Sequence, residues 1–160
     1  MKFGKFVLLC LFAFALATPA MADTTINVKL WDKGGMMDMS KNMAMGMGMH
    51  GNMKMAIMGI DVDQASVAAG KVTFNVANAS ADIQHEMLIS PITGPDVTLP
   101  FVAAENRVDE EASGDLGEVS ELDPGKSGAL TLDLKPGLYV LYCNIPGHFM
   151  AGMWTTIEVK

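Results

Sequence analysis

Apolar and polar residues alternate with a period of two over much of the chain after residue 23. In the runs 24–31, 71–78 and 129–134, Val, Ile, Leu or Phe takes every second position. This is the side-chain period of a β-strand with one buried face. Turn signals rich in Gly and Pro, such as the Asp-Pro-Gly at 123–125, separate the runs. We therefore predict an all-β chain folded as an antiparallel β-sandwich or barrel.

The first 22 residues have the features of a secretory signal peptide. Lys2 and Lys5 precede an apolar run at 6–16, and Ala-Met-Ala at 20–22 has the small residues of a cleavage site. The apolar run is too short to span a bilayer comfortably. We expect cleavage after these residues and export to the periplasm.

The remaining chain, 23–160, is long enough for a single domain with its own core. It has no apolar run of the length that a membrane span needs. It keeps nine basic and 18 acidic residues, a net charge of −9. This charge argues against nucleic acid or an anionic membrane surface as a partner.

The region 34–54 interrupts the alternation and is predicted to be a flexible insertion rich in Met and Gly. Between residues 36 and 58 there are ten methionines, and every second residue from Met43 to Met49 is one. Thioethers are soft, uncharged ligands that suit Cu(I). The alternatives are that these side chains pack on the sandwich or on a partner, or act as a sulfoxide sink. Methionines after residue 54 are assigned to a strand over 55–62. The candidates for an auxiliary Cu(I) site are Met43, Met45, Met47, Met49, His50 and Met53.

The stretch 142–154 places Cys143, His148 and Met153 at a Cys-x4-His-x4-Met spacing. A Pro-Gly turn lets a loop of this length bring thiolate, imidazole and thioether to one point. Cys143 is the only cysteine after the leader, and an unpaired thiol in an oxidising compartment is vulnerable unless something occupies it. His85, at the start of another apolar run, is the candidate for the fourth ligand. Two imidazoles, one thiolate and a weak axial thioether are the blue-copper ligand set.

Two alternatives to this assignment stay open. Met150 competes for the axial position, although it lies only two residues after His148 and has little chain with which to reach the other side of a metal. The set could also be a chance combination of a core cysteine, a turn histidine and a core methionine. In the copper interpretation, Pro146, Phe149 and Met150 form an apolar collar around an exposed edge of His148, where electrons enter or leave.

These motifs are similar to those of the cupredoxins, the small blue-copper proteins, and the resemblance extends over most of the chain after the leader. It is carried by the GxYxxYC approach to Cys143, the Cys-x4-His-x4-Met loop, and GKVTFNVANAS followed by His85. The loop spacing is similar to that of rusticyanin and auracyanin. The Met-rich insertion resembles that of the periplasmic copper-tolerance cupredoxins of the CopI type. The resemblance implies a Greek-key β-sandwich.

The resemblance also implies one type 1 copper as cofactor. His85 and His148 would bind it through Nδ1, Cys143 through its thiolate and Met153 axially. Many cupredoxins follow the first histidine with Asn, which ties the two ligand loops together, whereas this chain has Glu86. The residues expected around the ligands, or at the point of electron entry, are Glu86, Asn144, Phe149 and Met150.

Catalysis is not expected. Three histidines are too few for a multicopper oxidase, and the chain shows no nucleophile motif or phosphate-binding loop. The first hypothesis is a monomeric protein of copper tolerance that redox-cycles its own copper and collects Cu(I) on the Met-rich segment. The second is a diffusible one-electron carrier between respiratory or photosynthetic partners. In either case the partners are copper ions and a redox or copper-transfer protein.

Overall fold

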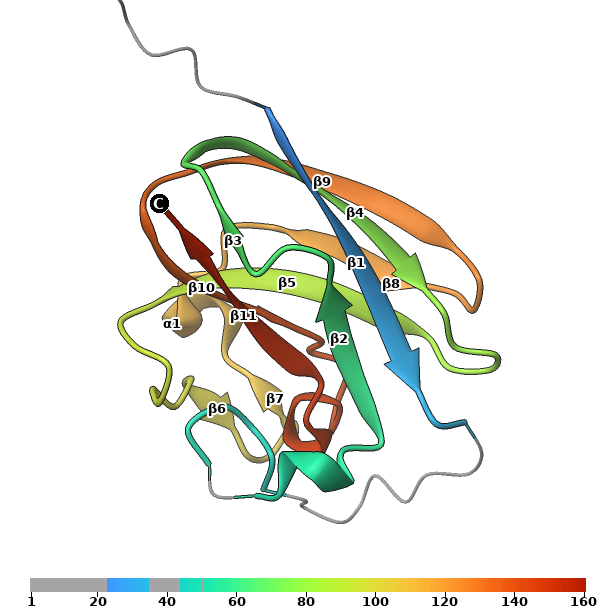
Figure 1. Cartoon of the computed structure of the whole chain (residues 1–160). Helices are drawn as coiled ribbons and strands as arrows, with labels where there is room; N and C mark the ends of the chain where they lie inside the picture. The colour runs from blue at the N-terminus through green and yellow to red at the C-terminus, as the bar shows by residue number, and fades with distance from the viewer. Residues whose placement is uncertain (1–22, 35–43, 50) are drawn as a thin grey trace, which may run out of the picture.

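The computed structural model describes residues 23–34, 44–49 and 51–160, which form a β-sandwich with very little helix (Figure 1). The short helices are η1 (Met53–Met55), α1 (Glu110–Ser113) and η2 (Phe149–Ala151). The strands are β1 (Thr24–Asp32), β2 (Met58–Val62), β3 (Ser66–Val67), β4 (Gly70–Asn78), β5 (His85–Ile92), β6 (Phe101–Val102), β7 (Arg107–Val108), β8 (Glu118–Leu122), β9 (Ser127–Leu134), β10 (Gly137–Tyr142) and β11 (Trp154–Val159).

Two main sheets make up the sandwich, and their strand orders are β2-β1-β4-β9 and β3-β11-β10-β5-β8. Most neighbouring strands are antiparallel, but β1 pairs with β4, and β3 with β11, in parallel. The parallel pair β1 and β4 needs a long connection, which runs through the Met-rich region, β2 and β3. The predicted all-β sandwich is confirmed, with mixed sheets in place of purely antiparallel ones.

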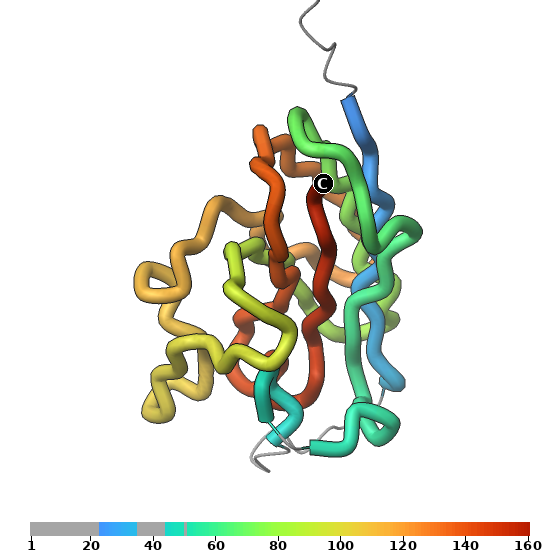
Figure 2. The backbone as a smooth tube through the Cα atoms, turned by 60° about the vertical axis from the view of Figure 1, so that its left-hand side comes forward, coloured from blue at the N-terminus to red at the C-terminus, as the bar shows by residue number. Residues whose placement is uncertain are grey.

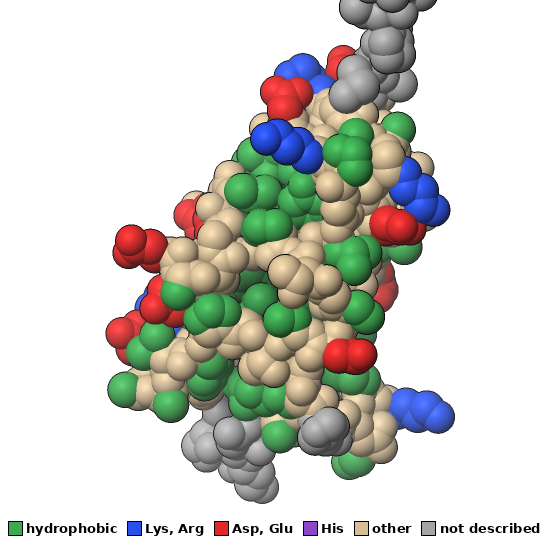
Figure 3. All heavy atoms as spheres, turned by 90° about the vertical axis from the view of Figure 1, so that its left-hand side faces the viewer, with side chains coloured by type: hydrophobic (Ala, Val, Ile, Leu, Met, Phe, Trp, Pro, Cys, Tyr) green, Lys and Arg blue, Asp and Glu red, His purple; other side chains and the backbone are tan. Residues whose placement is uncertain are grey.

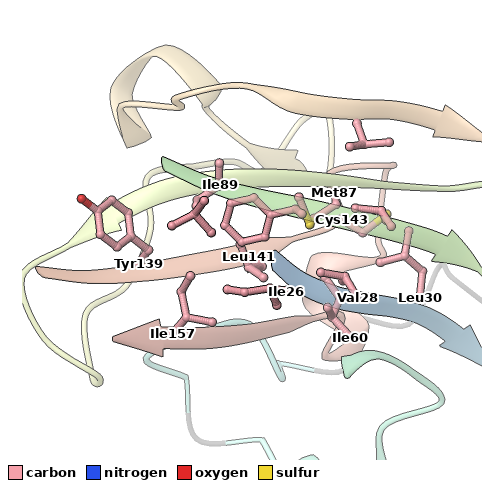
Figure 4. Close-up of a cluster of buried hydrophobic side chains, with 14 of the residues drawn as sticks. Ile26, Val28, Leu30, Ile60, Met87, Ile89, Tyr139, Leu141, Cys143 and Ile157 are labelled. Carbon is pink, nitrogen blue, oxygen red and sulfur yellow. The ribbon is translucent and has the colours of Figure 1, made fainter. Parts of the chain in front are cut away.

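The period-two pattern places one face of each strand in the core between the sheets. Along β1 the side chains of Ile26, Val28 and Leu30 are buried while their neighbours are exposed or partly exposed. Figure 4 shows them among side chains of β5, β10 and β11, together with Cys143, which directly follows β10. The thiol predicted as a ligand therefore lies at the edge of this main core.

A second hydrophobic cluster covers the outer face of β5 and β10 at one end of the sandwich. Because apolar side chains cover both faces there, β5 and β10 have almost continuous buried runs instead of alternation. The buried members of this cluster are Met47, Leu88, Leu99, Val108, Val140, Tyr142, Phe149 and Met150. The region predicted as a flexible insertion thus contributes to a core, through Met47.

The start of one strand differs from that predicted. The strand expected over 55–62 begins at Met58, and Met55 lies in η1 with 65% of its surface exposed. The side chain of Asn52 accepts a hydrogen bond from the Lys54 amide at 3.1 Å and so starts this helical turn ahead of the strand. Among the described residues, no helix is long and apolar enough to cross a membrane.

Candidate metal centre

Three side chains predicted as ligands meet at one end of the sandwich. Nδ1 of His148 lies 3.3 Å from Nδ1 of His85 and 3.3 Å from Sγ of Cys143. All three donor atoms lie within 4.8 Å of one another, and all three residues are buried. Residues separated by 63 positions in the sequence, His85 and His148, therefore share one site.

The loop between β10 and β11 positions Cys143 and His148 by closing on itself. The Cys143 amide donates to the Met153 carbonyl at 3.1 Å, and the Met153 amide donates to the His148 carbonyl at 3.1 Å. Gly152 has a φ of 97°, a left-handed conformation that favours glycine, and reverses the chain after η2. The loop therefore holds its ends together around His148.

The two methionines of this loop occupy different clusters. Met153 is fully buried and belongs to the main core together with Cys143. Met150 belongs to the second cluster with Phe149. Met153 thus shares a cluster with the thiol, which favours it over Met150 as the fourth ligand candidate.

Burial favours the uncharged form of each of the three donors. It raises the pKa of the Cys143 thiol to about 12. Burial, with a further contribution from the charge of His85, lowers the pKa of His148 to about 4. Burial also lowers the pKa of His85, against the opposing effect of Asp32. Because a thiol binds a metal as the thiolate, a soft cation would have to displace the proton of Cys143.

The donor set fits copper. It combines a thiol and two imidazoles, with the thioether of Met153 in the same core cluster as the thiol, and these ligand types suit both copper oxidation states. The three donor atoms face one another, and none of the three is a carboxylate. The face shown in Figure 3 displays no histidine surface among its described residues, in agreement with the burial of both rings.

Glu86 connects the two segments that supply the ligands. Its Oε1 accepts a hydrogen bond from the Asn144 amide at 3.0 Å. Glu86 directly follows His85, and Asn144 directly follows Cys143. The Asn144 side chain extends this link, because it donates to the Glu110 carboxylate at 2.8 Å and exchanges hydrogen bonds with the backbone of Val108. A carboxyl group thus makes the connection between ligand loops that the resemblance assigns to Asn.

This buried carboxyl group predicts a pH-dependent stability. Burial, followed by repulsion from Glu118, raises the pKa of Glu86 from 4.5 to about 7. A carboxyl whose pKa is raised by folding stabilises the protein below its unfolded pKa, and this stability is lost as the pH rises through the folded pKa. A shift of this size corresponds to at most about 3 kcal/mol. Glu86→Gln keeps the acceptor oxygen but cannot titrate. Its free energy of unfolding should therefore lack this pH-dependent contribution.

The measurement is urea unfolding of the metal-free protein between pH 5 and 8. The free energy of unfolding of wild type, minus that of Glu86→Gln, should increase as the pH falls, because Glu86 becomes protonated and its ionised form is no longer buried. Contributions from the histidines are the same in both proteins and cancel in this difference. Glu158→Gln, an exposed carboxylate at the far end of β11, is the control and should follow the wild-type profile. A wild-type and Glu86→Gln difference that is constant with pH would contradict the prediction.

The described part of the Met-rich region lies against the ligand loop (Figure 2). The Met45 amide donates to the Met150 carbonyl at 3.1 Å, and the Trp154 indole donates to the Met45 carbonyl at 2.7 Å. Gly46 has no room for a side chain, because a Cβ there would lie 2.8 Å from the ring of Phe149. Segment 44–49 therefore covers the ligand loop as a packed layer.

The six candidates for an auxiliary copper site are not equivalent. Met45 and Met47 are buried, Met49 is partly buried, and Met53 in η1 is 41% exposed. Met43 and His50 lie outside the described residues, as do the predicted signal peptide, residues 1–22, and the rest of residues 35–43. Met45 and Met47 thus pack against the domain, as the packing alternative expects.

The apolar collar expected around His148 has a different form in the structure. Phe149 and Met150 are buried, and His148 itself is only 5% exposed, while Pro146 is exposed. Met47, Gly46 and the ring of Tyr142 lie against Phe149. Covering by segment 44–49, which the sequence does not reveal, is the physical reason for this difference.

Asp32, a residue that we did not predict, contacts the site directly. Its Oδ2 lies 2.9 Å from Nε2 of His85, and both side chains are buried, with exposures of 1% and 0%. Burial would raise the pKa of Asp32, but hydrogen bonds from Ser80, His85 and Gly34 outweigh it and lower the pKa. A signal was present in the sequence, since Asp32 continues the inward-facing row 26, 28 and 30 of β1.

Comparison with known proteins gives a consistent result. The family model described as "Copper binding proteins, plastocyanin/azurin family" matches residues 44–160. Rusticyanin from Thiobacillus ferrooxidans superposes with a TM-score of 0.55 at 16% identity, over 86% of this chain and 77% of rusticyanin. Auracyanin B superposes with a TM-score of 0.51 at 21% identity, over 90% and 93%. These two similarities establish the fold. No curated protein matched the chain.

Proposed function

The chain belongs to the plastocyanin/azurin family of copper-binding proteins, and from this premise we propose that it is a one-electron copper protein of copper tolerance. The observation that carries the redox part is the buried convergence of Cys143, His85 and His148 within 4.8 Å. A site enclosed by protein offers no open position to a substrate. It therefore suits electron transfer and not catalysis.

In this proposal His85 and His148 would hold copper through Nδ1, Cys143 through Sγ and Met153 through its thioether. The bound copper supplies a Cu(I)/Cu(II) couple. The chain keeps the ligands in one arrangement through the closed β10–β11 loop and the link from Glu86 to Asn144. Such restraint reduces the rearrangement that accompanies gain or loss of one electron.

The copper-tolerance role is proposed from the Met-rich region. Met53 presents its thioether on the surface of η1 and packs beside Gly152 at the end of the ligand loop. Together with Met43, Met49 and His50 of the same region, Met53 would form an auxiliary Cu(I) site. We assign Met45 and Met47 a packing role in addition, because both are buried.

The alternative function is a diffusible electron carrier. It is favoured by the burial of Met45 and Met47, since methionines that fill a core are accounted for without metal. In both alternatives the protein works in the periplasm after removal of residues 1–22, as a monomer, with a redox or copper-transfer protein as partner.

Deletion of the gene tests the proposal. The deletion strain should tolerate severalfold less copper than the parent strain, while its respiration at low copper stays normal. Wild-type protein should restore tolerance, and Cys143→Ser should not. A chain with Met43, Met45, Met47, Met49 and Met53 changed to Leu should restore it only in part, because Leu keeps the apolar volume but removes the sulfur.

The deletion strain also separates the two alternatives. Slowed electron flow at low copper, with unchanged copper tolerance, would overturn the copper-tolerance role and favour the carrier. Full complementation by the Met-to-Leu chain would remove the auxiliary site from the proposal. Equal amounts of each protein in the periplasmic fraction are the control for expression and export.

A further inference from the structure

We propose that Asp32 is a positioning residue of the copper centre, which holds His85 in the tautomer with Nδ1 free for copper and places a buried carboxylate behind that ligand. The inference rests on copper binding at this centre and is independent of the copper-tolerance role. Asp32 is not one of the four ligands, because it reaches the ring nitrogen on the far side of His85.

The geometry of Asp32 is determined by its place in β1. It is the last residue of the strand and pairs with Met58 across β1 and β2. Because side chains alternate along a strand, Asp32 lies on the same inward face as Ile26, Val28 and Leu30. An acidic side chain in such a row is unusual, since burying a carboxylate is costly unless it is well hydrogen-bonded.

Hydrogen-bond donors offset this cost. Oδ2 faces Nε2 of His85 at 2.9 Å, and Oδ1 accepts from the Gly34 amide at 2.7 Å. The Ser80 hydroxyl donates to the same carboxylate, while its own oxygen accepts the Ile83 amide at 2.9 Å. The carboxylate is thus fixed by three separate parts of the chain.

The contact with Asp32 settles which ring nitrogen of His85 carries the proton. A carboxylate can only accept, so the hydrogen bond at 2.9 Å requires the proton on Nε2. Nδ1, which lies 3.3 Å from Nδ1 of His148, then carries the lone pair and points into the site. Fixing the tautomer in this way prepares the ring for a metal before any metal arrives.

The carboxylate also acts on the redox couple. A negative charge behind a ligand in a buried site interacts more favourably with Cu(II) than with Cu(I), because the oxidised ion has the larger charge. Its hydrogen bond makes the imidazole more basic, which acts in the same direction. Asp32 should therefore lower the midpoint potential of this centre.

The contact with Gly34 gives Asp32 a second connection. Gly34 is the last described residue before the gap at 35–43, so the carboxylate joins a copper ligand to the beginning of the Met-rich region. The preceding amide, that of Lys33, donates to the Ile57 carbonyl at 2.9 Å. The chain just before the Met-rich region is thus joined to the chain that follows it.

The first experiment uses Asp32→Asn, which keeps an oxygen acceptor and the side-chain shape but removes the charge. We expect the ratio of Cu(II) to Cu(I) affinity to fall about tenfold, which for a one-electron couple raises the midpoint potential by about 59 mV. Asp63→Asn is the matched control, because Asp63 binds Asn27 of the same strand from an exposed position. Its potential should equal that of wild type.

The second experiment determines the tautomer by ¹⁵N NMR of the histidines in metal-free protein, which separates this inference from copper function. Wild type should show His85 protonated on Nε2, and Asp32→Ala should show a mixture of tautomers. A wild-type His85 protonated on Nδ1 would overturn the proposal, even if Asp32→Asn failed to fold. An unchanged potential in folded, copper-loaded Asp32→Asn, or an equal shift in Asp63→Asn, would overturn it as well.

Discussion

Replacing Cys143 by Ser should abolish the strong thiolate-to-copper absorption of the Cu(II)-loaded protein. The thiol is fully buried, and its Sγ lies 3.3 Å from Nδ1 of His148. A serine hydroxyl fits the same space but does not supply the soft, easily oxidised thiolate from which this transition arises. The visible spectra of the two proteins, loaded with equal Cu(II), provide the measurement.

The control for this experiment is Met150→Leu, which removes a sulfur from the same loop. Because Met150 packs in the second cluster with Phe149, its loss should leave the band in place. A band that survives Cys143→Ser, or a colourless wild-type Cu(II) complex, would contradict the assignment of the centre. Loss of the band in Met150→Leu would instead return Met150 to consideration as the axial ligand.

Replacing Phe149 by Ala should reduce the free energy of unfolding of the metal-free protein by about 3–5 kcal/mol. The ring is fully buried and stacks edge-on against Tyr142, with centroids 6.0 Å apart. It also fills the space beside Gly46, where a Cβ would lie 2.8 Å from it. Its loss leaves a cavity between the ligand loop and segment 44–49. Urea unfolding measures the effect on global stability.

Hydrogen exchange shows whether the cavity also loosens the covering segment. The amide of Met45, which donates to the Met150 carbonyl, should exchange faster in Phe149→Ala. Phe101→Ala is the matched control, because that ring also contacts Phe149, with centroids 6.4 Å apart, but is only partly buried. Its cost should be smaller. A cost for Phe149→Ala no larger than that of the control would show that segment 44–49 does not depend on this ring.

These two substitutions address different properties of one region. Cys143 supplies a donor that the chemistry of copper requires, whereas Phe149 keeps the ligand loop and segment 44–49 together. A cupredoxin centre needs both, because a fixed ligand arrangement depends on residues that never contact the metal. The link from Glu86 to Asn144 and the contact of Asp32 with His85 belong to this supporting set.

The sequence by itself determined the features that depend on local patterns. The period-two runs predicted the strands because a strand buried on one face places every second side chain in the core, as β1 and β4 do. The Cys-x4-His-x4-Met spacing predicted the ligand loop because its members are joined by a short stretch of chain. His85 could be included because the chemistry of the set required a second imidazole.

Only the tertiary structure decided which distant groups support these ligands. Asp32 meets His85 across 53 residues, and Glu86 meets Asn144 across 58. Methionine also gave no local signal for its environment, since its flexible thioether suits a core as well as a metal. The burial of Met45 and Met47 depended on the surface that the ligand loop presents once both sheets are assembled. Long-range contacts of this kind follow from how the sheets pack, and sequence spacing does not encode them.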